Sequence, residues 1–472
     1  MLLRQIYDSD LSQTSYIIGC QATGEAIVVD PRRDVEEYIK IADENGLKIS
    51  AVTETHIHAD YLSGTRELAE RTGAKIYVSD EGGKDWTYGE AFSGAVRMKH
   101  AHKIRLGNIT IEAVHTPGHT PEHMSFLVSD GAQADVPGFM LTGDFVFVGD
   151  VGRPDLLDEA AGGIDTRFKG ARDLFASLKN HFVTLPDYVQ VLPGHGAGSP
   201  CGKALGSVLS STVGYERKVA WWSSYVDKDD EEGFVSELLS GQPDAHAYFA
   251  RMKRQNKEGP AIIGDSLFIV EYESGQISES IDNGEVIIVD TRSHHEVHAD
   301  TVKGALNIPG IAKASTYGGW VYDPERESRP LIVLASDADE ARKYHDHFVR
   351  VGIDSLRGYI TSLDDLPRAD IQVVKPEDLH TLKDATLIDV RNRTEHITGH
   401  VPGSVNLGGG RILWELDRLP SEGTVVTYCQ SGVRNSVVAS ALRLHGHNVV
   451  ELEGSYGQWS CVPGNEPARL SE

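Results

Sequence analysis

The sequence contains few cysteines, and they are widely spaced. Cys20, Cys201, Cys429 and Cys461 are too few and too scattered for a disulfide framework. We therefore expect a reducing, cytoplasmic location, in which each cysteine is a buried thiol, a ligand or a nucleophile. No apolar run approaches the ~18 residues that a membrane span requires. Residues 1–10 also lack the apolar core of a signal peptide.

Positive charge is scarce as well. The chain has 45 Lys and Arg residues against 70 Asp and Glu residues, which gives a net charge of −25. A balance this acidic argues against general binding to nucleic acid or to an anionic membrane, because both require basic patches. We therefore expect neither nucleic acid nor a membrane among the partners.

The length of 472 residues suggests about two to four domains. In the N-terminal half, short β-runs alternate with helical patterns. Strands are predicted at Tyr16–Gly19, Ala26–Asp30 and Ile49–Thr53, and a helix is predicted over Asp34–Asn45, ending at Gly46. This alternation predicts an α/β fold.

The C-terminal half contains an internal repeat. The segment Met252–Pro260 is polar and closes with Gly-Pro, so we predict a linker there. Beyond it, an Asp-x-Arg strand end and a Gly-containing element each occur twice, and both recur at an offset of 99 residues (Asp290 and Asp389, Gly304 and Gly403). We therefore predict three α/β domains, at residues 1–252, 262–362 and 371–472.

Histidines and aspartates follow four apolar strand patterns in the first of these domains: Ile49–Thr53, Ile109–Val114, Met140–Thr142 and the run that ends at Leu192. They are His56, His58 and Asp60, then His119, then Asp144, and finally His195. Imidazole and carboxylate suit transition metals, and the neighbouring glycines and prolines fix tight turns that aim side chains at one point. The sequence therefore predicts a metal site at the strand ends.

This arrangement resembles the metallo-β-lactamase superfamily over about residues 1–250. The pattern His-x-His-x-Asp-His, followed by histidine, aspartate and histidine, is specific to that superfamily, and the resemblance implies an αββα sandwich. One position departs, because Tyr61 stands where the family usually has histidine. A phenol of pKa ~10 is a poor ligand at neutral pH, which favours one metal ion over two.

Within the superfamily, the sequence is similar to the persulfide dioxygenases, which bind one iron. The resemblance implies that His56, His119 and Asp144 hold one Fe(II) per chain, as two histidines and a carboxylate do in non-haem oxygenases. Four further residues would then orient the ligands from outside: His58, Asp60, Tyr61 and His195. Spacing alone does not exclude His58 as a ligand.

Two more residues near this site are candidates for binding substrate. Arg153 lies in an element similar to the Gly-Arg-x-Asp of the dioxygenases, so it would hold the ligating aspartate or a substrate anion, or else pair with Asp155. Cys201 follows His195 by six residues and is expected near the mouth of the site. It is either a substrate contact or persulfide relay, or an inert thiol.

The second repeat ends a predicted strand with Cys429, and a helix pattern follows. The loop between them, Gln430, Ser431, Gly432 and Val433, closes at Arg434. Backbone N–H groups and a helix N-terminus favour a thiolate and cradle an anionic sulfur. The loop is similar to that of the rhodanese sulfurtransferases, which implies that Cys429 carries a persulfide and that Arg434 assists it.

The first repeat departs from this pattern. It has Ser336-Asp-Ala-Asp-Glu where the cysteine loop should stand, so we predict an inactive rhodanese-like domain. The pair His294 and His295 has no partner pattern and is predicted to be solvated.

The order of domains resembles bacterial persulfide dioxygenase–sulfurtransferase fusions. The resemblance implies oxidation of a low-molecular-weight thiol persulfide by O₂ to sulfite, and sulfur transfer that gives thiosulfate. Two alternatives stay open: a zinc thioester hydrolase like glyoxalase II, and a non-enzymatic carrier of sulfane sulfur. We also expect a homo-oligomer. The sequence does not identify the thiol.

Overall fold

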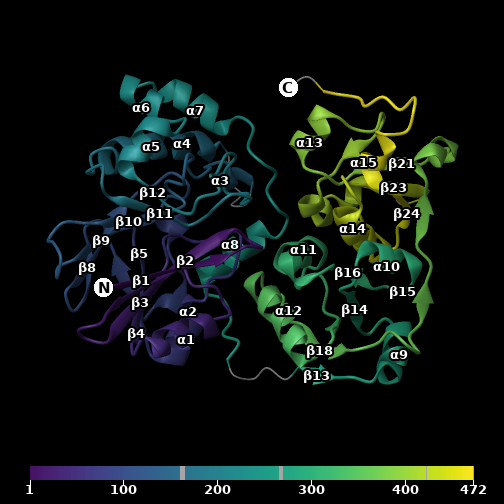
Figure 1. The fold of residues 1–472 in the computed structure, drawn as a ribbon, viewed down its shortest axis with the longest axis horizontal. Helices are drawn as coiled ribbons and strands as arrows, with labels where there is room; N and C mark the ends of the chain where they lie inside the picture. Colours follow the sequence, from purple (N-terminus) through teal and green to yellow (C-terminus); the bar gives the residue numbers. More distant parts are fainter. Residues whose placement is uncertain (160–164, 265–268, 421, 471–472) are drawn as a thin grey trace. The chain divides into compact units, whose positions relative to one another are not determined.

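The computed structural model describes residues 1–159, 165–264, 269–420 and 422–470, and the chain divides into two compact units (Figure 1). Unit 1 comprises Met1–Gln242 and Phe249–Asp265, and unit 2 comprises Pro243–Tyr248 and Ser266–Glu472. In the described residues, no helix has both the length and the apolar character needed to cross a membrane.

Unit 1 contains two six-stranded sheets. The first has the strand order of the sequence: β1 (Leu2–Asp8), β2 (Gln13–Cys20), β3 (Glu25–Val29), β4 (Lys48–Thr53), β5 (Lys75–Ser79) and β6 (Val96–Met98). The second runs in the reverse order: β12 (Ser211–Thr212), β11 (Gln190–Pro193), β10 (Phe139–Gly143), β9 (Met124–Asp130), β8 (Ile109–His115) and β7 (Lys103–Leu106).

Helices cover the outer faces of both sheets. The helices of unit 1 are α1 (Glu36–Glu44), α2 (Thr65–Thr72), α3 (Leu156–Glu159), α4 (Thr166–Ser177), α5 (Val213–Val219), α6 (Ser223–Lys228), α7 (Glu231–Leu239) and α8 (Phe249–Glu258). The helix predicted at residues 34–45 is α1, and the expected glycine follows it, because Gly46 has φ +64°.

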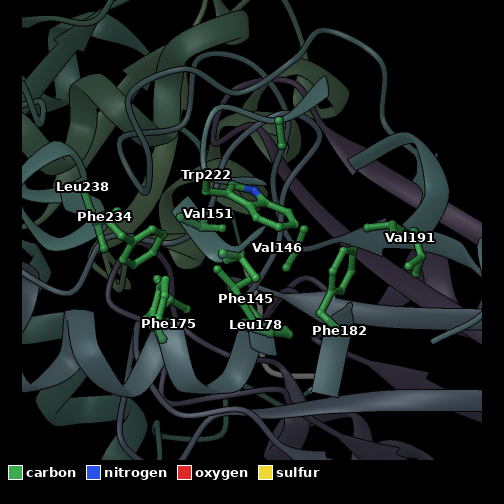
Figure 2. Close-up of a cluster of buried hydrophobic side chains, with 14 of the residues drawn as sticks. Phe145, Val146, Val151, Phe175, Leu178, Phe182, Val191, Trp222, Phe234 and Leu238 are labelled. Atoms are coloured by element: carbon green, nitrogen blue, oxygen red, sulfur yellow. The ribbon is translucent and has the colours of Figure 1, made fainter. Parts of the chain in front are cut away.

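Three apolar cores separate four layers. One core lies between the two sheets and includes Ile18, Val29 and Phe126. Another joins the first sheet to α1 and α2. The third packs α4 to α7 on the second sheet, with Trp222 and Phe182 at ring centroids 5.7 Å apart (Figure 2). These layers confirm the αββα sandwich.

The prediction of a linker at residues 252–260 is wrong. These residues belong to α8 or follow it directly, and the predicted domain boundary at 252 falls inside the helix. The polar composition misled because α8 is buried along one side only, where Phe249 and Met252 pack inward and Asn256 makes buried hydrogen bonds. The segment that leaves unit 1 is Pro243–Tyr248, and the N–H of Ala247 donates to the carbonyl of Gly410 in unit 2 (2.6 Å).

Unit 2 contains two five-stranded parallel sheets with equivalent strand orders. The first is β13 (Val270–Glu271), β18 (Leu356–Ile360), β17 (Leu331–Leu334), β14 (Ile287–Asp290) and β16 (Leu306–Asn307). The second is β20 (Gln372–Val374), β24 (Asn448–Leu452), β23 (Thr424–Tyr428), β21 (Thr386–Asp389) and β22 (Val405–Asn406). A separate ribbon pairs β15 (Thr301–Val302) with β19 (Arg368–Ala369).

The helices of unit 2 alternate with these strands. They are α9 (Ser274–Asp282), α10 (His294–Ala299), α11 (Ala314–Val321), α12 (Ala338–Arg350), α13 (Arg393–Thr398), α14 (Val433–Leu444) and α15 (Ser455–Trp459). A helix was expected after Cys429 with its pattern at Ser436–Arg443, and α14 begins three residues earlier than that pattern.

The repeated sequence landmarks make the same contacts in both copies. Arg391 forms an ion pair with Asp389 at 2.7 Å, as Arg292 does with Asp290 at 2.7 Å. The side chain of Asn406 donates to the carbonyls of Asp389 and Arg391, and the equivalent Asn307 does the same in the first copy. The 99-residue offset therefore reflects a repeated strand pairing that is locked by an arginine and an asparagine.

Candidate functional site

The histidines and aspartates of unit 1 converge at the ends of neighbouring strands. His56, His58 and Asp60 follow β4, and His119 follows β8. Asp144 and His195 follow β10 and β11, which are parallel partners and therefore end at the same edge of the second sheet.

One carboxylate oxygen of Asp144 lies at the centre of this cluster. Oδ2 is 3.5 Å from Nε2 of His119, 3.5 Å from Nε2 of His195 and 3.9 Å from Nε2 of His56. His56, His119 and Asp144 are at most 3% exposed, and they offer ligand atoms that all lie within 4.8 Å of one another. The structure thus brings together the three residues that the resemblance selects.

Each of the three histidines is oriented by a hydrogen bond at its other ring nitrogen. Nδ1 of His119 lies 2.9 Å from the carbonyl oxygen of Arg153, and Nδ1 of His195 lies 3.0 Å from that of Ser12. Nδ1 of His56 lies 2.9 Å from the Thr55 hydroxyl, whose own hydrogen is donated to Asp30. Because Nδ1 carries the proton in each case, the lone pair of Nε2 faces Asp144, which is the orientation of a metal ligand.

The charge states of the cluster also suit a cation. Burial lowers the pKa of His56 well below its usual value, and burial lowers the pKa of His119, so both imidazoles are neutral donors. Burial alone would raise the pKa of Asp144, but His195 and His119 outweigh it and lower the pKa. Both carboxylate oxygens of Asp144 are buried without a hydrogen-bond partner among the described residues. A buried anion left in this state fits a metal ion at the site.

A second group of donors adjoins the first. Asp60, His195 and Cys201 are all buried, and Oδ2 of Asp60 lies 3.4 Å from Nε2 of His195. Burial and the nearby carboxylates of Asp144 and Asp60 raise the pKa of Cys201 well above its usual value, so its thiol stays protonated. Cys201 is therefore placed against the candidate metal centre as a neutral thiol rather than as an activated nucleophile.

His58 and Tyr61 point to Asp30 instead of the cluster. Nε2 of His58 lies 3.0 Å from Oδ1 of Asp30, and the Tyr61 hydroxyl donates to the Asp30 carbonyl at 3.2 Å. His58 therefore lies outside the group formed by His56, His119 and Asp144, and its Nδ1 is buried without a hydrogen-bond partner in the described part of the chain. Tyr61 is fully buried, and its hydroxyl is engaged in this hydrogen bond to the Asp30 carbonyl.

Arg153 takes the local partner that the sequence left open. Its guanidinium pairs with Asp155, with Nε at 2.9 Å from Oδ1, and Nη1 donates to the Pro200 carbonyl at 3.0 Å. Its backbone carbonyl orients His119. Arg153 therefore supports the site through the loops on both sides of it.

Sequence reasoning missed residues that hold the ligand loops from a distance. Asp30, at the end of β3, accepts from Thr55 and contacts His58. His123 accepts the backbone N–H of Asp144 at Nε2 (3.1 Å). The spacing of His123, four residues after His119, was an available signal; Asp30 ends a predicted strand, but its partners are distant in sequence and could not be read from it.

Asn256 of α8 fastens the loop that carries His56 and His58. Its side chain donates to the carbonyls of His58 (2.8 Å) and Tyr61 (2.7 Å) and accepts from the N–H of Ser63 (2.8 Å). All three bonds are buried, so their loss leaves three backbone groups unsatisfied.

Replacing Asn256 with alanine is expected to destabilise unit 1 by about 2–4 kcal/mol. The unfolding temperature should fall by about 6–12 °C, measured by calorimetry, and bound metal should be lost more readily on dialysis. Asn45→Ala is the matched control, because Asn45 is exposed and its side chain donates to the Ile41 carbonyl of helix α1, away from the histidine loop. Equal unfolding temperatures for Asn256→Ala and the parent protein would contradict this role.

In unit 2, Cys429 lies between β23 and α14 as predicted. Its sulfur accepts the N–H of Gly432 at 3.1 Å, and the Ser455 hydroxyl donates to it at 3.9 Å. Gly432 has φ +109°, a conformation that lets the loop turn its amides toward the sulfur. Ser431, Gln430 and Val433 complete the loop, and α14 begins at Val433, so its N-terminus adjoins the sulfur.

Two residues outside the Cys429 loop, Glu395 and His294, contact it, and the sequence indicated neither contact. Arg434 forms a bidentate ion pair with Glu395 of α13, at 2.7 and 2.9 Å. Its charge is therefore partly balanced by the Glu395 carboxylate. His294 of the first copy is half-buried rather than solvated, and a Cβ added to Gly432 would lie 2.7 Å from its Nε2.

In the equivalent loop of the first copy, side-chain carboxylates accept hydrogen bonds from the backbone N–H groups of the loop and of the helix start. The side chain of Asp337 accepts from the N–H of Glu340 at the start of α12 (2.8 Å), and Glu340 accepts from the N–H of Ser336 (2.7 Å). Amides that would cradle an anion in the second copy are thus already occupied.

Comparison with known proteins agrees with this architecture. Residues 8–195 match the metallo-β-lactamase superfamily, and residues 375–461 match the rhodanese-like domain. A metallo-β-lactamase from Staphylococcus aureus subsp. aureus COL is 39% identical, with a TM-score of 0.68 over 76% of this chain and 99% of that one.

Two curated relatives match unit 1. The mitochondrial persulfide dioxygenase ETHE1 of Mus musculus is 28% identical over 41% of this chain and 68% of its own length. A probable polyketide biosynthesis zinc-dependent hydrolase of Bacillus velezensis is 26% identical over 44% of this chain and 84% of its own length.

The chain belongs to the metallo-β-lactamase superfamily, and its C-terminal part is a rhodanese-like domain. The assignment of the first copy in unit 2 to the rhodanese family stays a prediction.

Proposed function

We propose that unit 1 is a persulfide dioxygenase with one ferrous ion per chain, and that the second copy in unit 2 is a sulfurtransferase. The overall oxidation is RSSH + O₂ + H₂O → RSH + SO₃²⁻ + 2H⁺, in which the terminal sulfur is oxidised and O₂ is reduced. The sulfite then accepts sulfane sulfur and becomes thiosulfate. Similarity to the persulfide dioxygenases and the presence of a rhodanese-like domain support the pairing.

The observation that carries the proposal is the buried carboxylate of Asp144, which lacks a hydrogen-bond partner in the described residues and faces Nε2 of His56 and His119. Two histidines and one carboxylate form the ligand set of non-haem iron oxygenases. Bound there, a ferrous ion would supply the redox chemistry between a persulfide sulfur and O₂. His195 directs Nε2 at the same carboxylate oxygen (3.5 Å), and Asp60 lies beside that nitrogen (3.4 Å), so both residues would orient the ligands from outside.

The sulfur transfer uses the chain's own nucleophile. The Cys429 thiolate attacks the outer sulfur of a persulfide and releases the thiol, which leaves a persulfide on Cys429. Sulfite then attacks that outer sulfur, so thiosulfate leaves and the thiolate is restored. The amide of Gly432 and the hydroxyl of Ser455 stabilise the negative charge on sulfur in both states.

The proposal predicts the metal and the oxygen chemistry together. Protein purified without oxygen should contain one iron per chain, measured by elemental analysis. Iron-loaded protein should consume O₂ on an oxygen electrode when a thiol persulfide is added, with sulfite and thiol as products. Zinc at the site together with thioester hydrolysis and no O₂ uptake would contradict the proposal.

That contrary result would favour a zinc hydrolase, to which the Bacillus velezensis relative draws attention. Tyr61 is the observation against it. In two-metal members the residue at this position helps to hold the second ion, whereas the Tyr61 hydroxyl is engaged by the Asp30 carbonyl.

A further inference from the structure

The Cys429 loop of the second copy is in contact with a side chain of the first copy. The N–H of Gly432 donates to the sulfur of Cys429 at 3.1 Å. A Cβ added to Gly432 would lie 2.7 Å from Nε2 and 2.8 Å from Cδ2 of His294, the first residue of α10. One edge of that imidazole therefore fills the space that a side chain at Gly432 would need, directly beside the amide that binds the sulfur.

The backbone of His294 is fixed by a capping box at the start of α10. The Ser293 hydroxyl accepts the N–H of Glu296 at 3.4 Å, and the Glu296 carboxylate accepts the N–H of Ser293 at 3.0 Å. These reciprocal hydrogen bonds close the turn that contains His294. The imidazole is thus presented to Gly432 from a closed helical turn.

A buried carboxylate connects α10 to the second copy. Nε2 of His298, one helical turn after His294, lies 3.1 Å from Glu451, which is fully buried in β24. Arg443 and Asn435 of α14 also donate to Glu451, at 2.7 and 3.0 Å. Although burial alone would raise the pKa of Glu451, His298 and Arg443 outweigh it and lower the pKa, so a buried charge joins the two copies.

The first copy also binds α14, the helix whose N-terminus adjoins the sulfur. The N–H of Asn307, in β16, donates to the Ser440 hydroxyl at 3.0 Å, and the Ser436 hydroxyl donates to Oδ1 of Asn307 at 2.7 Å. All three residues are at most 4% exposed. Because buried hydrogen bonds are costly to break, these contacts keep His294 against the Cys429 loop.

The contact restricts the rotation of Gly432. Glycine lacks the Cβ that confines other residues, and the φ of +109° lies in a region that other residues rarely adopt. A rotation of this peptide would turn its N–H away from the sulfur. Burial and the neighbouring His295 and His298 lower the pKa of His294, so its ring is neutral at pH 7 and acts on Gly432 through its shape.

We propose that His294 is a positioning residue of the sulfurtransferase site in the second copy. Its ring keeps the Gly432 amide directed at the Cys429 sulfur, so the copy that has no cysteine still takes part in transfer. The inference rests on the proposed function for the reaction RSSH + SO₃²⁻ → RSH + S₂O₃²⁻. In that reaction the outer sulfur passes through Cys429, its hydrogen ends on the released thiol, and no external oxidant or reductant is needed. The orientation of the amide does not require turnover.

The first measurement is sulfur transfer by the iron-loaded full chain without oxygen, so that unit 1 forms no sulfite of its own. Glutathione persulfide and sulfite are supplied, and thiosulfate is quantified by chromatography. Removal of an aligned donor costs about 10²–10³ in kcat, so its misalignment in His294→Ala should lower kcat by about tenfold, with KM for sulfite changed less than about twofold. His294→Gln, whose amide group reaches about as far as Nε2, should restore kcat to within about threefold of the parent.

The second measurement is hydrogen exchange of the peptide that contains residues 429–434, read by mass spectrometry, which requires no sulfur chemistry. The Gly432 amide should exchange at least about tenfold faster in His294→Ala than in the parent, and His294→Gln should keep its protection. His380→Ala is the matched control, because His380 is an exposed histidine of the second copy. It should leave both transfer and exchange unchanged.

Three results would overturn the inference: unchanged exchange of Gly432 in His294→Ala, unchanged kcat in that variant, or equal losses of kcat in His294→Ala and His294→Gln. The last result would mean that the contact with Gly432 is not the reason for the loss. Faster exchange in His294→Ala, combined with a parent protein that forms no thiosulfate, would count against the proposed sulfurtransferase alone.

Discussion

Replacing His56 with alanine is expected to release the metal and to lower persulfide-dependent O₂ uptake by more than about a hundredfold. Loss of an outer partner of a metal ligand already costs about 10–100-fold in affinity or activity, and His56 presents Nε2 directly to Asp144. The measurements are iron content by elemental analysis and the initial rate on an oxygen electrode. Both should fall together, because the proposed oxidation depends on the ion.

His100→Ala serves as the control for the loss of an imidazole. His100 is exposed in the same unit, where its Nδ1 accepts the backbone N–H of His115 at 3.2 Å and its ring contacts that of His181. Its variant should keep both iron and O₂ uptake. If O₂ uptake survived in a folded His56→Ala protein, unit 1 would not be the oxidising site, and a role for the chain as a carrier of sulfane sulfur through Cys429 would gain support.

Replacing Cys429 with serine is expected to abolish transfer of sulfur to sulfite, by at least about 10³-fold, while O₂ uptake in unit 1 continues. A hydroxyl at this position cannot hold a persulfide, and removal of a covalent nucleophile costs several orders of magnitude. Thiosulfate and sulfite are quantified separately by chromatography after addition of a thiol persulfide. Sulfite should accumulate as thiosulfate disappears.

Cys461→Ser is the matched variant, because Cys461 is an exposed cysteine of the same unit whose thiol donates to the Gly457 carbonyl. It should form thiosulfate at the parent rate. Loss of both activities in a folded Cys429→Ser protein would show that oxidation and transfer are not divided between the two units as proposed.

Local patterns in the sequence predicted most of the architecture and the members of the site. The strand-end positions of His56, His119, Asp144 and Cys429 were readable because a strand pattern and the polar residues after it are adjacent in the chain. The repeat was readable from its fixed offset, and the structure explains that offset by the Asp-x-Arg and asparagine contacts.

The remaining features depend on partners that are distant in the chain. Asp30 meets His58 across 28 residues, and Glu395 meets Arg434 across 39. Neither pairing has a periodic signature, so the partner of each residue could not be read from the sequence. Helix α8 was missed for a related reason: its buried side is partly polar, because Asn256 bonds to loop carbonyls instead of packing against an apolar core.

The position of Asn256 late in unit 1 determines when the loop of His56 and His58 can reach its folded state during synthesis. The loop with His56 and His58 is synthesised early, yet the side chain that fastens it arrives 198 residues after His58. The loop that carries His56 and His58 therefore leaves the ribosome before Asn256 does. Its hydrogen bonds with Asn256 can form only after α8 has left the exit tunnel. A fragment ending at residue 252, the boundary suggested by composition, would lack Asn256. A separately expressed N-terminal unit should therefore extend to residue 264.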